Sequence, residues 1–271
     1  MTFCSAMLLA FSSLNAQQNT TNTAPESKVV TGTVLVNDQT PFDFKSLRQS
    51  LVSDWGVRLD SFNQAEKTLV LYTPGATVML AWLDYPAAPA EIRSAAEGAW
   101  LWKSASAEAP RHQAQVVISV IGSPRRPLDV YKLYTRVVAA ALDNTRSCGV
   151  YLASQYLLQS KAFFLQAARG LEQNTLPVYC WIYFGMFQEN DLSSGYSYGL
   201  TEFGMPDLEI FRSKHTMQEV HAILYDAVTD ALQNGVKLQE GSTIETLEGQ
   251  KIALKLSKAS FWEGQTLKVN Y

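Results

Sequence analysis

The sequence has few of the residues from which metal sites and disulfide frameworks are built. Its 271 residues include 3 cysteines and 3 histidines, and it contains neither a paired C-x-x-C nor an H-E-x-x-H motif. No apolar run reaches the roughly 18 residues of a membrane-spanning helix. The net charge of -3 gives no basic stripe for phosphates. These absences argue against a metal site, a transmembrane segment and nucleic-acid binding, and no motif indicates a cofactor.

The composition is that of a folded globular protein. Hydrophobic residues make up 47% of the chain and charged residues 17%, far from the balance at which chains stay disordered. The length allows one large domain or two smaller ones.

The N-terminus differs from the rest of the chain. Residues 3–14 are apolar and are followed by Asn15-Ala16-Gln17 and a polar tract, an order typical of a secretory signal followed by a mature linker. We therefore expect a signal peptide at 1–16, a linker at 17–28, and export to the periplasm or medium. The alternative is a buried N-terminal segment of a cytoplasmic protein.

Cys148 and Cys180 remain if Cys4 is removed with the signal. Both lie beside apolar runs, where buried thiols are common. We favour free thiols, although two cysteines could pair in an oxidising compartment.

Hydrophobic spacing predicts β-α-β-β-α-β order over residues 29–122. The expected elements are strands at 29–36, 68–72, 76–83 and 113–121 and helices at 44–55 and 91–102. This is the order of a ferredoxin-like unit, so we predict a first ferredoxin-like half.

The second half, 123–271, contains similar parts. We expect helices at 128–142, 157–168 and 216–232, strands at 149–153, 178–187, 196–200 and 208–211, and a C-terminal hairpin at 243–247 and 251–256. Thr216 and Glu219 match a capping box. The predicted fold is therefore α+β, with two ferredoxin-like halves forming mixed or antiparallel sheets covered by helices.

The sharpest catalytic signal is Gly195-Tyr196-Ser197-Tyr198-Gly199, which matches the G-x-S-x-G nucleophile elbow. The elbow requires a strand before the serine and a helix after it. Here a polar turn precedes the motif, and Gly204 and Pro206 follow it. We therefore interpret Ser197 as part of an extended segment and keep a serine hydrolase as an alternative.

Two other groups of residues are candidates for metal or acid/base chemistry. The loop acids could form a cation site or an acid/base pair, but they lack the EF-hand spacing; they are Glu189, Asp191, Glu202, Asp207 and Glu209. One helix cannot turn His215, Glu219 and His221 toward one metal ion.

Arg125-Arg126 precedes a helix and could attract an anion, but a solvated turn is the simpler interpretation. Trp55, Trp100 and Trp102 are interpreted as core anchors and helix-face residues.

A set of short motifs in the second half resembles a bacterial family, domain of unknown function 4261. The motifs are Leu176-Pro177, Trp181-Ile182, Tyr198-Gly199-Leu200, Phe203-Gly204 and Asp207-Leu208-Glu209-Ile210, and the segments 96–102 and 112–120 fit as well. The resemblance implies no established activity and no catalytic residues.

We therefore predict a non-enzymatic binding or interaction protein whose partner is unknown and could be a protein. The candidate binding surface consists of Trp181, Tyr198, Phe203, Asp207 and Glu209. No catalytic residue is assigned. The alternatives are a serine hydrolase using Ser197 and a cation-dependent enzyme at the acidic cluster.

Overall fold

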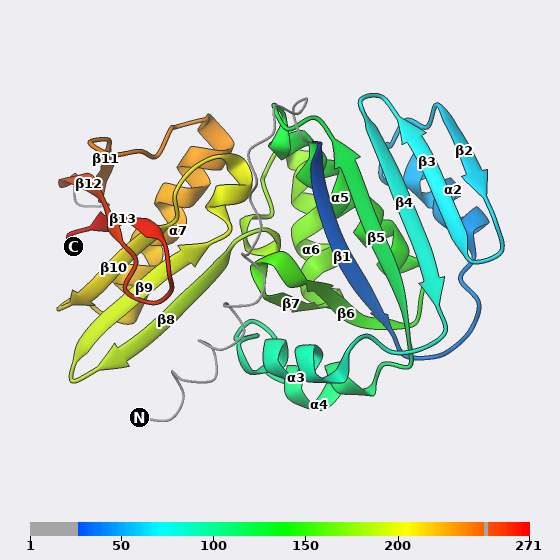
Figure 1. Ribbon diagram of the computed structural model, residues 1–271, viewed down its shortest axis with the longest axis horizontal. Coiled ribbons are helices and arrows are strands. Elements are labelled where there is room, and N and C mark those ends of the chain that lie inside the picture. Colours follow the sequence, from blue (N-terminus) through cyan, green and yellow to red (C-terminus); the bar gives the residue numbers. More distant parts are fainter. Residues whose placement is uncertain (1–26, 247–248) are drawn as a thin grey trace.

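The computed structural model describes residues 27–246 and 249–271 (Figure 1). The predicted signal peptide and most of the predicted linker lie outside these residues. Lys28, placed in the linker by the sequence, is the first residue of a strand. No helix in the described ranges is long and apolar enough to cross a membrane.

The first sheet is antiparallel and, among the described residues, has the strand order β2-β3-β4-β5-β1-β6-β7. Its strands are β1 (Lys28–Val36), β2 (Ser61–Gln64), β3 (Thr68–Thr73), β4 (Ala76–Leu83), β5 (Ala114–Gly122), β6 (Ser147–Leu152) and β7 (Leu157–Ser160).

Helices cover both faces of the first sheet (Figure 1). The predicted cap Asp43 starts α2 (Phe44–Ser53) by accepting backbone N–H bonds from Lys45 and Ser46. This helix and α5 (Pro127–Asp143) pack in one hydrophobic cluster with alternate residues of β1, β3, β4 and β5. Buried small and β-branched residues of α5 allow it to lie close to the sheet.

The opposite face carries a smaller cluster. There α3 (Pro89–Glu97) and α4 (Ala105–Glu108), followed by the short 3₁₀ helix η1 (Ala109–Arg111), pack on Leu35, Tyr151 and Leu158. These residues belong to β1, β6 and β7 and point away from α5.

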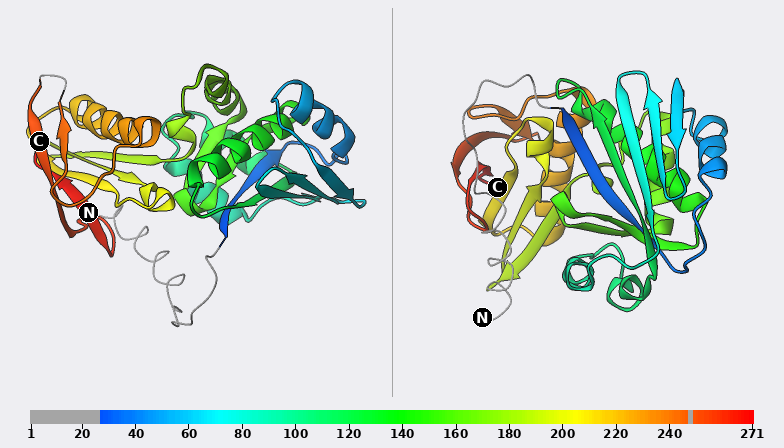
Figure 2. Two further views of the ribbon diagram at one scale, coloured as in Figure 1. Left: turned by 90° about the horizontal axis from the view of Figure 1, so that it is seen from above. Right: turned by 45° about the vertical axis from the view of Figure 1, so that its right-hand side comes forward.

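The second sheet, in the described part of the chain, has the order β11-β12-β13-β10-β9-β8. Its strands are β8 (Tyr183–Glu189), β9 (Leu192–Tyr198), β10 (Leu208–Ser213), β11 (Thr243–Glu245), β12 (Lys251–Lys258) and β13 (Gln265–Val269). All neighbours are antiparallel except β10 and β13. The helix α7 (Met217–Asn234) covers one face; Figure 2, left, shows it above the strands, and no described helix covers the other face.

The fold is α+β with two mixed or antiparallel sheets, as predicted, but the described strands of the predicted first half do not follow the ferredoxin-like order. In that arrangement the first strand lies between the third and fourth strands of the unit. Here β1 lies between β5 and β6, and β4 pairs with β5 instead. The strands β2, β3, β4 and β5 form a meander. The other edge of β5 pairs with β1 along the whole length of β1, so β1 cannot lie between β4 and β5.

The predicted division at 122/123 does not coincide with the change of sheet. β6 pairs with β1 and β7 pairs with β6, so the first sheet extends to Ser160. The second sheet begins at Tyr183.

The predicted helix at 157–168 is two elements. Tyr156, at a φ of 54°, turns the chain so that β7 pairs with β6. The hydroxyl of Ser160 then accepts the N–H of Phe163 and starts α6 (Lys161–Arg169), which continues into η3 (Gly170–Gln173). An apolar run alone does not distinguish a short strand followed by a helix from one continuous helix.

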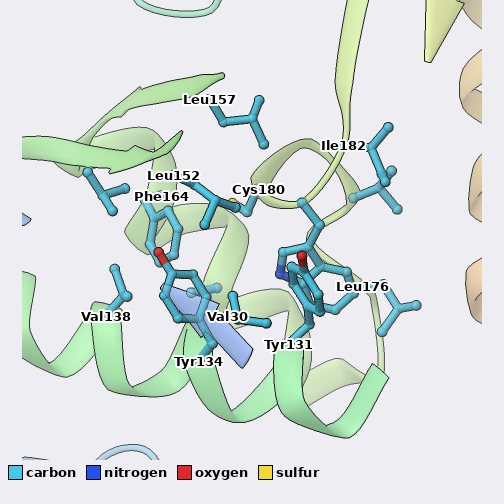
Figure 3. Packing of buried hydrophobic residues seen from close by; sticks show 14 of the residues in the cluster. Val30, Tyr131, Tyr134, Val138, Leu152, Leu157, Phe164, Leu176, Cys180 and Ile182 are labelled. Atoms are coloured by element: carbon cyan, nitrogen blue, oxygen red, sulfur yellow. The ribbon is translucent and has the colours of Figure 1, made fainter. Parts of the chain in front are cut away.

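The predicted strand at 178–187 is also divided. It begins with η4 (Val178–Cys180), and the strand starts at Tyr183. Trp181 packs against Tyr131 of α5 and Tyr179 against Phe163 of α6. Leu176, Cys180 and Ile182 belong to the same hydrophobic cluster as Tyr131 and Phe164, part of which is drawn in Figure 3. Cys148 and Cys180 are free thiols, as the sequence favoured.

The predicted helix at 91–102 ends at Glu97. Gly98 closes α3, and Trp100 lies in the following turn with 49% of its surface exposed. The core-anchor interpretation is therefore wrong for Trp100 and confirmed for Trp55 and Trp102, which are buried. The strands β2 and β13 were not predicted.

Candidate functional site

The motif around Ser197 forms a closed turn at the end of β9. Ser197 pairs with Phe184 in the sheet and is fully buried. Its hydroxyl donates to Oδ1 of Asp207 at 3.0 Å and accepts the N–H of Leu208 at 2.9 Å. The two residues therefore link β9 to the start of β10.

Asp207 also holds the turn that follows β9. Its carboxylate accepts the N–H groups of Gly199 at 3.3 Å and Leu200 at 3.0 Å, at the start of η5 (Leu200–Phe203). Burial raises the pKa of Asp207 to about 6, and these hydrogen bonds oppose the rise.

This geometry is not a nucleophile elbow. The elbow places its serine at an exposed corner between a strand and a helix, whereas Ser197 lies within β9 and contacts no solvent. Both hydrogen bonds of its hydroxyl join it to residues 207 and 208. Ser197 is therefore a positioning residue for the turn.

Two glycines allow the turn. Gly199 has a φ of 123° and Gly204 a φ of 76°, both in the region that L-residues rarely adopt. A Cβ on Gly199 would lie 3.0 Å from Cγ of Gln155 and 3.1 Å from the carbonyl oxygen of Trp181. Gly199 is therefore required by close packing as well as by backbone conformation.

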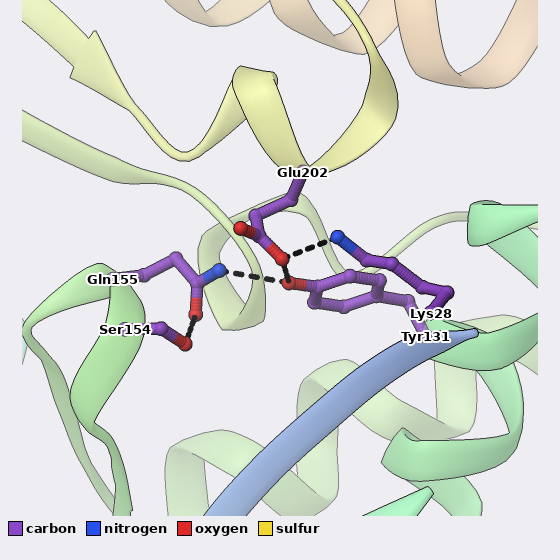
Figure 4. A network of polar contacts seen from close by, with 5 residues as sticks. All are labelled: Lys28, Tyr131, Ser154, Gln155 and Glu202. Carbon is purple, nitrogen blue, oxygen red and sulfur yellow. Dashed lines mark hydrogen bonds and ion pairs between the residues drawn. The ribbon is translucent and has the colours of Figure 1, made fainter. Parts of the chain in front are cut away.

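The turn carries Glu202 onto the first sheet (Figure 4). Oε2 of Glu202 lies 2.5 Å from Nζ of Lys28 on β1 and accepts a hydrogen bond from the hydroxyl of Tyr131 at 3.2 Å. Gln155, in η2 (Ala153–Gln155), donates to the same hydroxyl at 2.8 Å. These polar contacts connect the two sheets.

Phe203 and Trp181 complete this junction on the apolar side. The ring centroid of Phe203 lies 4.6 Å from that of Tyr131 and 6.0 Å from that of Trp181. The indole N–H of Trp181 donates to the hydroxyl of Thr135 at 2.8 Å, and Trp181 is fully buried. Both residues are therefore part of the interior between the sheets.

Glu209 points to the opposite face of the second sheet from α7, but it is also buried. Its carboxylate accepts hydrogen bonds from the hydroxyl of Thr266 at 2.9 Å and the N–H of Ser260 at 3.1 Å, and it forms an ion pair with Lys268. It holds the loop between β12 and β13 against β10.

The predicted candidate surface is therefore divided by the structure. Trp181, Asp207 and Glu209 are buried and have internal partners, and Phe203 packs in the junction. Of the five residues, only Tyr198 contributes to the face of the second sheet that no described helix covers.

That face is aromatic. Tyr196 and Tyr198 alternate with the inward-facing Gly195 and Ser197, and the loop between β12 and β13 adds Phe261 and Trp262. Successive ring centroids lie 4.4–5.8 Å apart, from Phe187 to Phe261, Tyr196, Trp262 and Tyr198. The ring centroid of Phe211 lies 5.9 Å from that of Phe261, and that of Tyr183 lies 6.2 Å from that of Tyr196. We call this set the aromatic face: Tyr183, Phe187, Tyr196, Tyr198, Phe211, Phe261 and Trp262.

The edge of the aromatic face toward β12 is basic. Cross-strand neighbours place Tyr196, Glu209, Lys268 and Lys255 in one row across the sheet. Lys268 is paired with Glu209, whereas Lys255 forms no ion pair with any described residue. Lys251, further along β12, lies opposite Glu245 of β11.

The acidic residues do not converge. Glu189 forms an ion pair with Arg212 at 3.3 Å, and Glu202 and Glu209 pair with separate lysines. Among the residues with described positions, no group of histidine, cysteine and acidic side chains could hold a metal ion.

The histidines considered for a zinc site are also apart. His215 stacks on Tyr271, while His221 lies within an aromatic cluster, its Nε2 3.2 Å from the hydroxyl of Tyr179. Burial lowers the pKa of His221.

The sequence interpretation missed Phe261 and Trp262 on the face and Lys28, Tyr131 and Gln155 in the junction. The alternation of tyrosines with glycine and serine over 195–199 was a signal for a sheet with one aromatic side. Nothing local indicated that residues 261 and 262 would fold over it.

Fold and site together define an α+β protein with two sheets, in which an ordered turn joins the sheets and one sheet face is aromatic. Residues 196–270 match the family model described as Domain of unknown function (DUF4261), so this part of the chain is a DUF4261 domain. No curated protein and no solved structure matches the chain.

The match confirms the resemblance stated from the sequence. It contains Tyr198, Phe203, Asp207 and Glu209, whereas the segments at 96–102, 112–120 and 176–182 lie outside the matched residues. The match therefore covers the turn and most of the second sheet.

Proposed function

We propose that this protein is a non-enzymatic interaction protein that binds a protein partner through the aromatic face. The observation that carries the proposal is the continuous set of aromatic rings on a sheet face that no described helix covers. Phe187 and Phe211 are 37% and 53% exposed. Contiguous exposed aromatic groups mark interaction sites more often than they mark plain surface.

The charges beside the face indicate the chemistry of the partner. Lys255 lies in the same row of the sheet as Tyr196 and forms no ion pair with a described carboxylate. A complementary surface would place apolar side chains on the rings and a carboxylate on Lys255. We therefore expect a protein surface with apolar anchors beside acidic residues.

The internal roles of the other candidates support a binding function over catalysis. Ser197 and Asp207 are occupied in holding the turn, and Glu189, Glu202 and Glu209 each have a separate partner. No observation favours a serine hydrolase or a cation-dependent enzyme.

The test places a photo-crosslinking amino acid at position 211 and, as a matched control, at position 62. Phe62 is 51% exposed but lies on β2 of the first sheet. We expect crosslinks from position 211 to a defined partner whose crosslinked peptide contains apolar and acidic residues. The purified partner should bind Phe211→Ser at least tenfold more weakly than wild type or Phe62→Ser, as for loss of an aromatic anchor.

Charge gives a second readout of the same interface. Lys255→Glu should weaken binding and reduce its dependence on salt. Equal crosslinking from both positions, or binding that is unchanged in Phe211→Ser, would reject the aromatic face. Labelling of Ser197 by a fluorophosphonate probe, lost in Ser197→Ala, would reject the non-enzymatic function.

A further inference from the structure

A cavity of about 260 Å³ lies at the end of the first sheet where β5 ends and β4 begins. This end is at the top of Figure 1. The cavity is formed by three segments distant in sequence: residues 56–58 after α2, the β3–β4 turn at 73–76, and residues of the β5–α5 loop and α5 between 123 and 136. It is far from the aromatic face, which lies on the other sheet.

The cavity wall has an excess of positive charge. Three arginines line it, Arg58, Arg126 and Arg136, against one carboxylate, that of Asp129. Arg126 forms an ion pair with Asp129. Nε of Arg58 lies 3.3 Å from Oδ1 of Asp60, a residue that does not line the cavity.

Arg136 is the distinctive member of the wall. It is half-buried on α5 and forms no ion pair or hydrogen bond with any residue whose position is described. A guanidinium that is partly removed from water without a protein acceptor is stabilised by an anion.

The remaining wall is apolar or already hydrogen-bonded. Val57, Pro74, Val130 and Leu133 supply apolar surface, and the hydroxyl of Thr73 donates to the carbonyl of Ala76 at 3.0 Å. The N-terminus of α5 contributes little to anion binding, because Pro127 has no N–H and Asp129 brings a negative charge into the first turn. Recognition in this cavity therefore depends on the arginines.

We propose that the cavity binds a small phosphate monoester. The planar guanidinium group forms paired hydrogen bonds with a phosphoryl group. Such a group would supply the acceptor that Arg136 lacks among the described residues, since Arg126 and Arg58 already pair with Asp129 and Asp60. The volume is near the lower end of ligand pockets, which begin at roughly 300 Å³, so the organic part is small and contacts the apolar wall. This site is independent of the proposed protein interaction.

The test measures thermal unfolding and calorimetric binding with glycerol phosphate and with inorganic phosphate, against sodium chloride at equal ionic strength. We expect both phosphates to raise the Tm saturably, with glycerol phosphate binding more tightly than inorganic phosphate. Arg136→Gln should increase the Kd at least tenfold, and Arg136→Lys should give an intermediate Kd because it keeps the charge but loses the fork.

Arg93→Gln is the matched control, since Arg93 is exposed on α3 away from the cavity. Its Kd should equal that of wild type. Arg58→Gln, at an exposed position, keeps the test valid if Arg136→Gln does not fold, and it should weaken binding by a smaller factor. The proposal is overturned if neither phosphate gives a saturable shift beyond sodium chloride, if Arg93→Gln loses as much affinity as the cavity variants, or if neither cavity variant weakens binding.

Discussion

At the residue scale, the serine and aspartate that looked catalytic in sequence are instead structural. Asp207 is 4% exposed and accepts hydrogen bonds from one hydroxyl and two backbone N–H groups. An enzyme would leave such a pair open to substrate. Here the pair satisfies the first N–H groups of η5, which would otherwise be buried without acceptors.

The pKa of Asp207 gives a prediction about stability and pH. Burial raises this pKa from 3.8 to about 6, so the native state holds a proton that the unfolded state has lost between these two values. The contribution to stability is complete below pH 3.8 and is lost as pH rises through about 6. Relative to Asp207→Asn, the wild-type free energy of unfolding should therefore fall by up to about 3 kcal/mol between pH 4 and pH 7.

Urea unfolding of both proteins across this pH range measures the difference. The free energy of unfolding of Asp207→Asn also differs from that of wild type by an amount that does not depend on pH, because the amide N–H₂ would face the N–H of Gly199. Asp191→Asn, in the exposed β8–β9 turn, is the control for replacing a surface carboxylate by its amide. A flat difference for Asp207→Asn would contradict the raised pKa.

At the scale of elements, the turn between β9 and β10 depends on two glycines with different constraints. Gly204 needs only its backbone conformation, since a Cβ there would meet nothing within 4 Å; Gly199 needs both conformation and space. We therefore expect a methyl group to lower the free energy of unfolding by different amounts at Gly199 and Gly204.

We predict that Gly204→Ala costs about 1–2 kcal/mol of unfolding free energy, the strain of an L-residue in the left-handed region. Gly199→Ala should cost about 3 kcal/mol or more, because strain is joined by contact with the rigid carbonyl of Trp181. Chemical denaturation of the two variants measures both values, and equal costs would show that packing around Gly199 adjusts freely.

The elements also indicate what the sequence could predict. Caps and periodic helices were predictable, as at Asp43, at the Thr216 and Glu219 capping box and along α7, because their signals are local. The division of 157–168 was not, because the choice between strand and helix at Leu157 depends on pairing with β6. The aromatic face was partly predictable from alternation at Tyr196 and Tyr198, but Phe261 reaches it through tertiary folding.

At the scale of the whole molecule, the two sheets share one hydrophobic cluster. Leu69 of β3, Phe164 of α6 and Leu267 of β13 belong to the same cluster. The polar contacts of Lys28, Glu202 and Tyr131 lie at its boundary (Figure 4). A substitution that weakens this junction should therefore lower the stability of both sheets.

Tyr131→Phe and Tyr134→Phe test this cooperativity as a matched pair. Both tyrosines are fully buried on α5, but only Tyr131 has hydroxyl partners; the hydroxyl of Tyr134 has none among the described residues. Tyr131→Phe removes the partner of Glu202 and Gln155 and should cost about 1–3 kcal/mol, whereas Tyr134→Phe removes an unsatisfied group and should be neutral or stabilising.

Hydrogen exchange of the most protected amides measures the change in stability of each sheet in these two variants. If the chain opens as one unit, Tyr131→Phe accelerates exchange by the same factor in β5 and in β10, since both report one global unfolding equilibrium. Acceleration confined to β10 would mean that the second sheet unfolds alone and that the shared cluster does not couple the sheets. Tyr134→Phe should leave both rates unchanged or slower, which separates the loss of the junction hydrogen bonds from the loss of a buried hydroxyl as such.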